Sequence, residues 1–143
     1  MTDEANINDG AQKRIRVVVA DDSAAFRTAI GRLLERLPCV ESIGFAEDGV
    51  QALALVAGTR PDLVLMDVQM PRLNGLEATR KIRADFPDIH VIMITLHDSE
   101  ELKVASVAAG ADWLISKRLL REVMPGAIAQ LFPAAETQTE NGI

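Results

Sequence analysis

Five side chains that could act together on a phosphoryl group follow or end short apolar segments of the sequence. They are Asp21, Asp22, Asp67, Thr95 and Lys117. Three carboxylates brought close together repel one another, so such a cluster must take up protons or bind a cation. Oxygen ligands suit Mg²⁺, which commonly uses one or two carboxylates and leaves room for phosphate oxygens. With a lysine and a hydroxyl beside the ion to bind phosphoryl oxygens, these residue types favour phosphoryl chemistry.

Taken one at a time, these residues also have a simpler interpretation. An aspartate after a strand is often a turn former or a helix cap. The simpler interpretation weakens only if all five residues meet at one edge of a sheet, which depends on the fold. The sequence has no GxxxxGK[ST] loop, so nothing in it is typical of a site that cradles a nucleoside triphosphate.

Short β-rich segments alternate with helix-like segments along the chain. The predicted strands are residues 15–20, 41–46, 62–66, 90–95 and 113–116. The predicted helices lie within residues 23–37, 50–58, 75–86, 99–110 and 122–132. Ser23 is the predicted N-cap of the first helix. Strand and helix alternating five times imply an α/β fold, because right-handed crossovers place helices on both faces of a parallel sheet.

Two helix ends depend on single residues. The fourth predicted helix has an N-cap candidate at Asp98 or Ser99, and Gly110 is its C-terminal stop. The last helix contains Pro125, which is tolerated in a first turn, so this helix is predicted to begin near residue 122. In a sheet of this kind the ligand site lies beyond the carboxyl ends of the strands, where the five side chains would converge.

The bulk composition restricts the class of protein. The 143 residues suffice for one domain, predicted over residues 14–132, with polar segments 1–13 and 133–143 expected to be disordered. The net charge of −6 and the scattered basic residues argue against nucleic acid as a direct partner of this domain. A single cysteine, no secretory signal and no apolar run long enough for a membrane span favour a cytoplasmic protein with no membrane partner.

The order of the motifs resembles the receiver domain of two-component response regulators. Four segments carry the resemblance: Asp21-Asp22, "MDVQMPRLNG" around Asp67, "MIT" ending in Thr95, and "AGADWLISK" ending in Lys117. The resemblance implies a flavodoxin-like, doubly wound (βα)5 fold with a five-stranded parallel sheet in the order 2-1-3-4-5. It also implies that a sensor histidine kinase or a phosphotransfer protein donates a phosphoryl group to Asp67.

The resemblance assigns a Mg²⁺ site to four residues. Asp22 and Asp67 would bind the ion directly, and Asp21 would act mainly through a metal-bound water. Gln69 would supply its backbone carbonyl as a further ligand. A receiver of this kind catalyses its own phosphorylation and dephosphorylation and turns over no external substrate.

The remaining carried-over roles concern the phosphoryl group and the conformational switch. Lys117 would pair with Asp67 before reaction and with a phosphoryl oxygen afterwards, and Thr95 would bind another phosphoryl oxygen. The position of the family's switch aromatic is Leu114, which has no ring to turn; a bulge that shifts the register by one would give this role to Trp113 instead. Output is expected through the surface of the fourth and fifth helices and the last strand.

Two further positions depart from the commonest receiver pattern. Arg118 follows Lys117 where a proline is frequent, which resembles the branch of receivers usually fused to a helix-turn-helix output domain. The chain could therefore be a stand-alone receiver or one cut from a longer DNA-binding regulator. Leu96 follows Thr95 where a small residue often leaves the site open.

Two other classes of protein remain as alternatives. An aspartyl-phosphate hydrolase of the haloacid-dehalogenase kind also uses an aspartate after a strand, but it needs a second acid two residues later, where this chain has Gln69. A flavin-binding electron carrier of the same fold would favour aromatic side chains to stack on the ring, and the chain has no tyrosine and one tryptophan.

Overall fold

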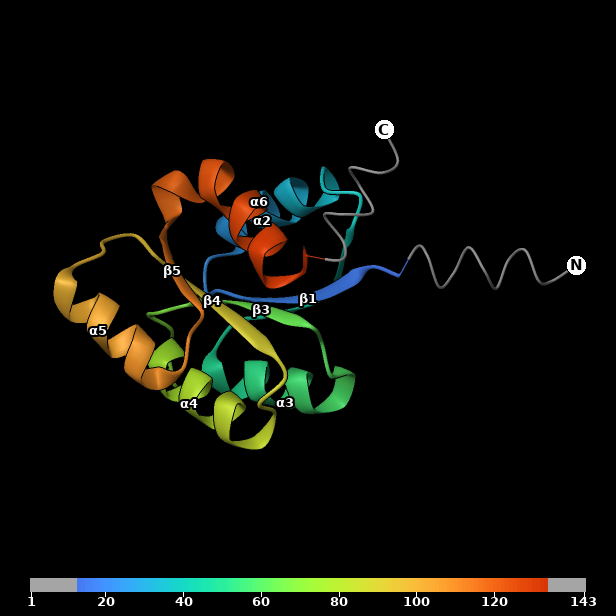
Figure 1. Cartoon of the computed structure of the whole chain (residues 1–143). Helices are drawn as coiled ribbons and strands as arrows, with labels where there is room; N and C mark the ends of the chain where they lie inside the picture. Colours follow the sequence, from blue (N-terminus) through green and yellow to red (C-terminus); the bar gives the residue numbers. More distant parts are fainter. Residues whose placement is uncertain (1–12, 134–143) are drawn as a thin grey trace, which may run out of the picture.

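A five-stranded parallel sheet forms the centre of the computed structural model, which describes residues 13–133 (Figure 1). The strands are β1 (Ile15–Ala20), β2 (Val40–Ala46), β3 (Leu63–Asp67), β4 (His90–Thr95) and β5 (Trp113–Ser116). Their order is β2-β1-β3-β4-β5, so the predicted flavodoxin-like topology is confirmed. The segments predicted to be disordered fall almost entirely in residues 1–12 and 134–143, outside the described residues.

Within residues 13–133, five α-helices cover the two faces of the sheet (Figure 1). They are α2 (Ala24–Glu35), α3 (Gly49–Thr59), α4 (Gly75–Asp85), α5 (Glu100–Ala109) and α6 (Leu120–Leu131). Helices α2 and α6 pack on one face, and α3, α4 and α5 pack on the other, which gives two hydrophobic cores on opposite sides of one sheet.

Strand β3 is buried on both faces, which explains its uninterrupted apolar sequence. Leu63 and Leu65 belong to the core under α2 and α6, whereas Val64 and Met66 belong to the core under α3, α4 and α5. Burial of each such side chain contributes roughly 1.5–3 kcal/mol relative to exposure. The strand is therefore a rigid support for its last residue, Asp67.

The predicted helix caps agree with the structure. The Ser23 side chain accepts a hydrogen bond from the Phe26 amide at the start of α2. At the start of α5 the cap is Ser99, not Asp98, and it accepts from the Leu102 amide. Gly110 ends α5 with φ of +100°, a left-handed conformation that glycine adopts without a steric penalty.

The predicted start of the last helix is wrong. A short 3₁₀ turn, η1 (Lys117–Leu119), leads directly into α6, which begins at Leu120 with Pro125 as its sixth residue. Pro125 has no amide hydrogen, so it cannot donate the helical hydrogen bond to the carbonyl of Arg121, four residues earlier. Arg121 is exposed to solvent. Burial of Leu120 and Met124 against the sheet favours the longer helix despite the missing hydrogen bond.

The loop after β3 folds back onto the end of that strand. The Gly75 amide donates to the Val68 carbonyl at 2.8 Å, which closes the loop. A Cβ atom at Gly75 would lie 2.1 Å from the Asp67 carbonyl oxygen, so no other residue fits without moving the backbone that carries Asp67. The close approach explains why a glycine opens α4.

We expect Gly75→Ala to lower the free energy of unfolding by about 1–3 kcal/mol, because the added methyl group overlaps a backbone oxygen. Denaturant unfolding measures the change. The matched control is Gly126→Ala in α6, where a Cβ meets nothing within 4 Å; it should be neutral or stabilising by up to about 1 kcal/mol. Equal effects of the two substitutions would contradict this description of the loop.

Candidate functional site

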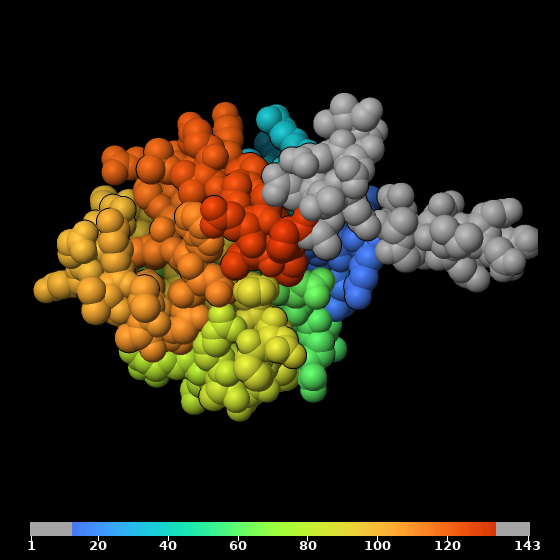
Figure 2. Space-filling model, viewed as in Figure 1, coloured from blue at the N-terminus to red at the C-terminus, as the bar shows by residue number. Residues whose placement is uncertain are grey.

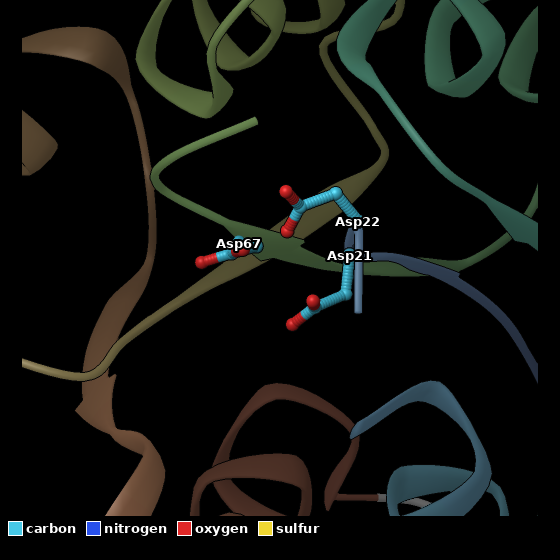
Figure 3. A group of neighbouring side chains, drawn as sticks. All are labelled: Asp21, Asp22 and Asp67. Carbon is cyan, nitrogen blue, oxygen red and sulfur yellow. The ribbon is translucent and has the colours of Figure 1, made fainter. Parts of the chain in front are cut away.

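Three carboxylates meet at the carboxyl edge of the sheet (Figure 3). Asp21 and Asp22 follow β1, and Asp67 ends the neighbouring strand β3. One oxygen from each carboxylate lies within 4.8 Å of the others. Asp21 and Asp67 are buried, whereas Asp22 is exposed. The fold thus brings together the acidic residues that the sequence placed after two different strands.

Asp21 is fixed in place by backbone and side-chain contacts. Its Oδ1 accepts a hydrogen bond from the Ser23 amide at 2.8 Å, and its backbone carbonyl accepts one from the Arg27 guanidinium at 2.6 Å. Its Oδ2 lies 2.8 Å from the Lys117 ammonium nitrogen. Oδ1 therefore has a hydrogen-bond donor, whereas the buried Oδ2 has the Lys117 ammonium as its ion-pair partner but no hydrogen bond.

Lys117 is the counter-ion at the centre of the cluster. Its Nζ lies 3.7 Å from Oδ2 of Asp67, farther than from Asp21, and 4.1 Å from the centre of the Phe26 ring. The resemblance implies pairing with Asp67, and the ammonium is within ion-pair distance of both carboxylates. One ammonium against three carboxylates leaves the cluster with excess negative charge.

That excess charge acts on Asp67. Burial and the neighbouring Asp21 carboxylate raise the pKa of Asp67 to about 6, while Lys117 and a hydrogen bond from the Gln69 backbone amide lower it. A divalent cation bound by oxygen ligands would remove the repulsion. The donor set of three carboxylates beside an open cleft therefore fits Mg²⁺.

An open cleft lies above the cluster. The predicted site residues that line it are Asp22, Asp67, Gln69, Thr95 and Lys117. Leu96 also lines the cleft and is 57% exposed. This residue, larger than the small one that is frequent at this position, therefore lies at the rim of the site. The Thr95 hydroxyl is engaged with the next loop, where it lies 3.3 Å from both the amide and the carbonyl of His97.

Leu114 is not brought to the cleft. It is partly buried in the core under α3, α4 and α5, whereas its neighbour Trp113 packs into the core on the opposite face. Strand β5 pairs with β4 in continuous register, with Leu114 opposite Met93 and Ser116 opposite Thr95. A bulge that would give Trp113 the place of the switch aromatic is absent from these pairs.

Sequence reasoning missed the contacts of two arginines, one at the cluster and one in the loop after Asp67. Arg27 binds the Asp21 carbonyl, and its guanidinium lies 4.0 Å from Glu47. Arg72, in the loop after Asp67, binds Asp48. Neither contact has a sequence signal, because a backbone oxygen is an acceptor in every residue and the second pair joins positions 24 apart.

Among residues 13–133, no helix is long and apolar enough to cross a membrane.

Comparisons with known proteins agree with the geometry. Residues 17–129 match the response regulator receiver domain family. The chain is 39% identical over 118 residues to the response regulator GacA of Pseudomonas aeruginosa and 33% identical over 117 residues to the transcriptional regulatory protein DegU of Brevibacillus brevis. These alignments cover 82% of this chain in both cases, but 55% and 50% of the relatives.

A solved structure has the same fold. It is a two-component response regulator of the LuxR family from Aurantimonas, with a TM-score of 0.78 and 28% identity, covering 90% of this chain and 98% of that one. The chain spans about half the length of the curated relatives it matches. Because the family match covers most of the chain and both cores, this protein belongs to the response regulator receiver domain family.

Proposed function

We propose that this chain is a phosphorylation switch in which Asp67 accepts a phosphoryl group from a sensor histidine kinase or a phosphotransfer protein. The observation that carries the proposal is the excess of carboxylates over ammonium groups in an open cleft. Mg²⁺ would be held by the Asp22 and Asp67 carboxylates and the Gln69 backbone carbonyl, with Asp21 acting through a water. The ion, when bound, neutralises negative charge on the phosphoryl oxygens.

In the proposed transfer, an Asp67 carboxylate oxygen forms a bond to phosphorus as the bond from phosphorus to the donor histidine nitrogen breaks. The bonding electron pair leaves with that nitrogen, and the leaving ring takes up one proton from solvent, so the donor returns to a neutral imidazole without an outside reductant or oxidant. Catalysis is then mainly positioning and charge stabilisation, as expected for a loose phosphoryl-transfer transition state. The rigid strand under Asp67 supports this positioning.

Lys117 and Thr95 serve the phosphorylated state in this proposal. The Lys117 ammonium, already 3.7 Å from Asp67, would bind one phosphoryl oxygen. The Thr95 hydroxyl would leave the His97 backbone and bind another. Since Leu114 has no ring to turn, the response would pass through the β4–α5 loop and shift α5.

The proposed output surface consists of α5, β5 and α6, the orange to red segments that face the viewer in Figure 2. Two valines on α5 support its use in protein contact, since Val104 and Val107 are 68% and 73% exposed. The target would be a partner protein or an output domain of a longer chain. Hydrolysis of the haloacid-dehalogenase kind is disfavoured, because the amide of Gln69 cannot act as a general acid.

We expect Asp67→Asn to abolish Mg²⁺-dependent phosphorylation, because the amide is not a nucleophile and is a poor ligand for Mg²⁺. Acetyl phosphate with intact-mass and peptide mass spectrometry measures the labelling. Asp85→Asn, which alters an exposed carboxylate at the far end of α4, should label like the wild type. Equal labelling of the wild type and Asp67→Asn at another residue would refute the assignment.

Lys117→Ala should separate metal binding from phosphoryl transfer. Removing the ammonium takes a competing positive charge from the acidic cluster, so the affinity for Mg²⁺ should stay the same or rise, while the rate of phosphorylation falls roughly tenfold or more. Mg²⁺ titration and labelling kinetics measure the two quantities. Lys103→Ala, which breaks an exposed ion pair with Glu100 on α5, is the control and should change neither. A large loss of Mg²⁺ affinity with unchanged labelling would contradict the proposed role.

A further inference from the structure

The loop after Asp67 contains a turn in an unfavourable backbone conformation. Arg72 has φ of +68° and is one of two non-glycine residues with positive φ among residues 13–133. The Leu73 amide donates to the Pro71 carbonyl at 2.7 Å, which closes a three-residue turn around Arg72. Turns of this kind with positive φ at the centre are rare and strained for residues that carry a Cβ. Contacts from outside the turn must therefore stabilise it.

The contact that stabilises the turn is an ion pair with Asp48. Nε and Nη2 of Arg72 both donate to Oδ2 of Asp48, at 3.0 Å and 2.7 Å. The other oxygen, Oδ1, accepts from the Gln51 amide and caps α3. The Asp48 side chain is only 8% exposed, although that of Arg72 is 62% exposed. Hydrogen bonds from the Gln51 amide and from Arg72 lower the pKa of Asp48, so the carboxylate stays ionised.

The same turn packs directly against the start of α3. A Cβ atom at Gly49 would lie 2.1 Å from the Leu73 carbonyl oxygen, so the helix and the loop are in close contact at this point. At its other end the loop is closed by the Gly75 amide on the Val68 carbonyl. Gln69 lies between these two attachments and lines the cleft. The ion pair and the glycine contact therefore fix the far side of the loop that carries a proposed metal ligand.

We propose that Asp48 and Arg72 are positioning residues that set the Mg²⁺ affinity of the site by fixing the 68–74 loop. This inference rests on the proposed function, because it concerns the ion that Asp22, Asp67 and the Gln69 carbonyl would hold. Neither Asp48 nor Arg72 lines the cleft, so they act through the loop backbone. Without the ion pair, the strained turn relaxes, and the Gln69 carbonyl loses its fixed direction. Residues that orient ligands in this way commonly affect metal affinity.

The test is a Mg²⁺ titration of the full chain followed by amide chemical shifts of Asp22 and Asp67 in NMR spectra. We expect Arg72→Ala and Asp48→Asn each to weaken Mg²⁺ binding roughly tenfold, at the low end of effects for residues that orient ligands. The double variant should bind no more weakly than either single variant, because both substitutions remove the same contact. Asn at position 48 can still cap α3, which keeps the helix start intact.

Two further variants separate positioning from general stability. Arg80→Ala removes an exposed arginine from its ion pair with Glu77 on the next helix and should leave Mg²⁺ affinity unchanged. Arg72→Gly removes the ion pair but relieves the backbone strain, so it should melt at or above the temperature of Arg72→Ala while binding Mg²⁺ equally weakly. At saturating Mg²⁺, labelling of the Asp48 and Arg72 variants by acetyl phosphate should stay within about twofold of the wild type, since these substitutions leave the nucleophile Asp67 unchanged.

Wild-type Mg²⁺ affinity in Arg72→Ala, with a lower melting temperature in EDTA, would overturn the inference and leave the pair a purely structural contact. Additive losses in the double variant would also overturn it, because they would mean that the two residues act separately. If the wild-type chain itself shows no response to Mg²⁺, the proposed function fails and this inference fails with it. A normal wild-type response with unaffected variants contradicts the positioning role alone.

Discussion

Repulsion among three carboxylates at one sheet edge is the constraint on which the rest of the structure depends. Asp21 and Asp67 are buried, so the energy of placing their charges together is not screened by bulk water. The two carboxylates nevertheless stay close together, because Asp21 follows β1 and Asp67 ends β3. These two strands pair in parallel between the two hydrophobic cores. Packing in the two hydrophobic cores offsets the unfavourable electrostatic energy of this edge. The excess negative charge that remains favours the binding of a cation.

The positively charged side chains near the site neutralise only part of the negative charge of the three carboxylates. Lys117 contacts Asp21 more closely than Asp67, and burial together with the Asp21 carboxylate raises the pKa of Asp67. Arg27 and Arg72 do not contact the acidic side chains of the cluster; they bind a backbone carbonyl of one loop and Asp48 beside another. These arginines fix the geometry of the loops, and the remaining negative charge stays available for a metal ion and a phosphoryl group.

Much of this arrangement could be predicted from the sequence, because the signals are local. Continuous apolar runs indicated buried parallel strands, and serine and glycine marked the ends of α5. The start of α6 was missed because the 3₁₀ turn after Lys117 has no distinctive composition and because burial of Leu120 outweighs the cost of Pro125. The Asp48–Arg72 pair was missed because it depends on how two loops pack, which no periodicity encodes.

The most direct test of this account is an NMR titration of the Asp67 side-chain carboxyl carbon with pH, without and with saturating Mg²⁺. The account predicts a pKa near 6 without the ion, since burial and Asp21 favour the protonated form, and a clearly lower pKa when Mg²⁺ is present. Asp67 would then be mostly ionised above pH 6 in the metal-free protein and at lower pH in the metal-bound one. A pKa near the ordinary value of 3.8 that does not respond to Mg²⁺ would contradict the central claim.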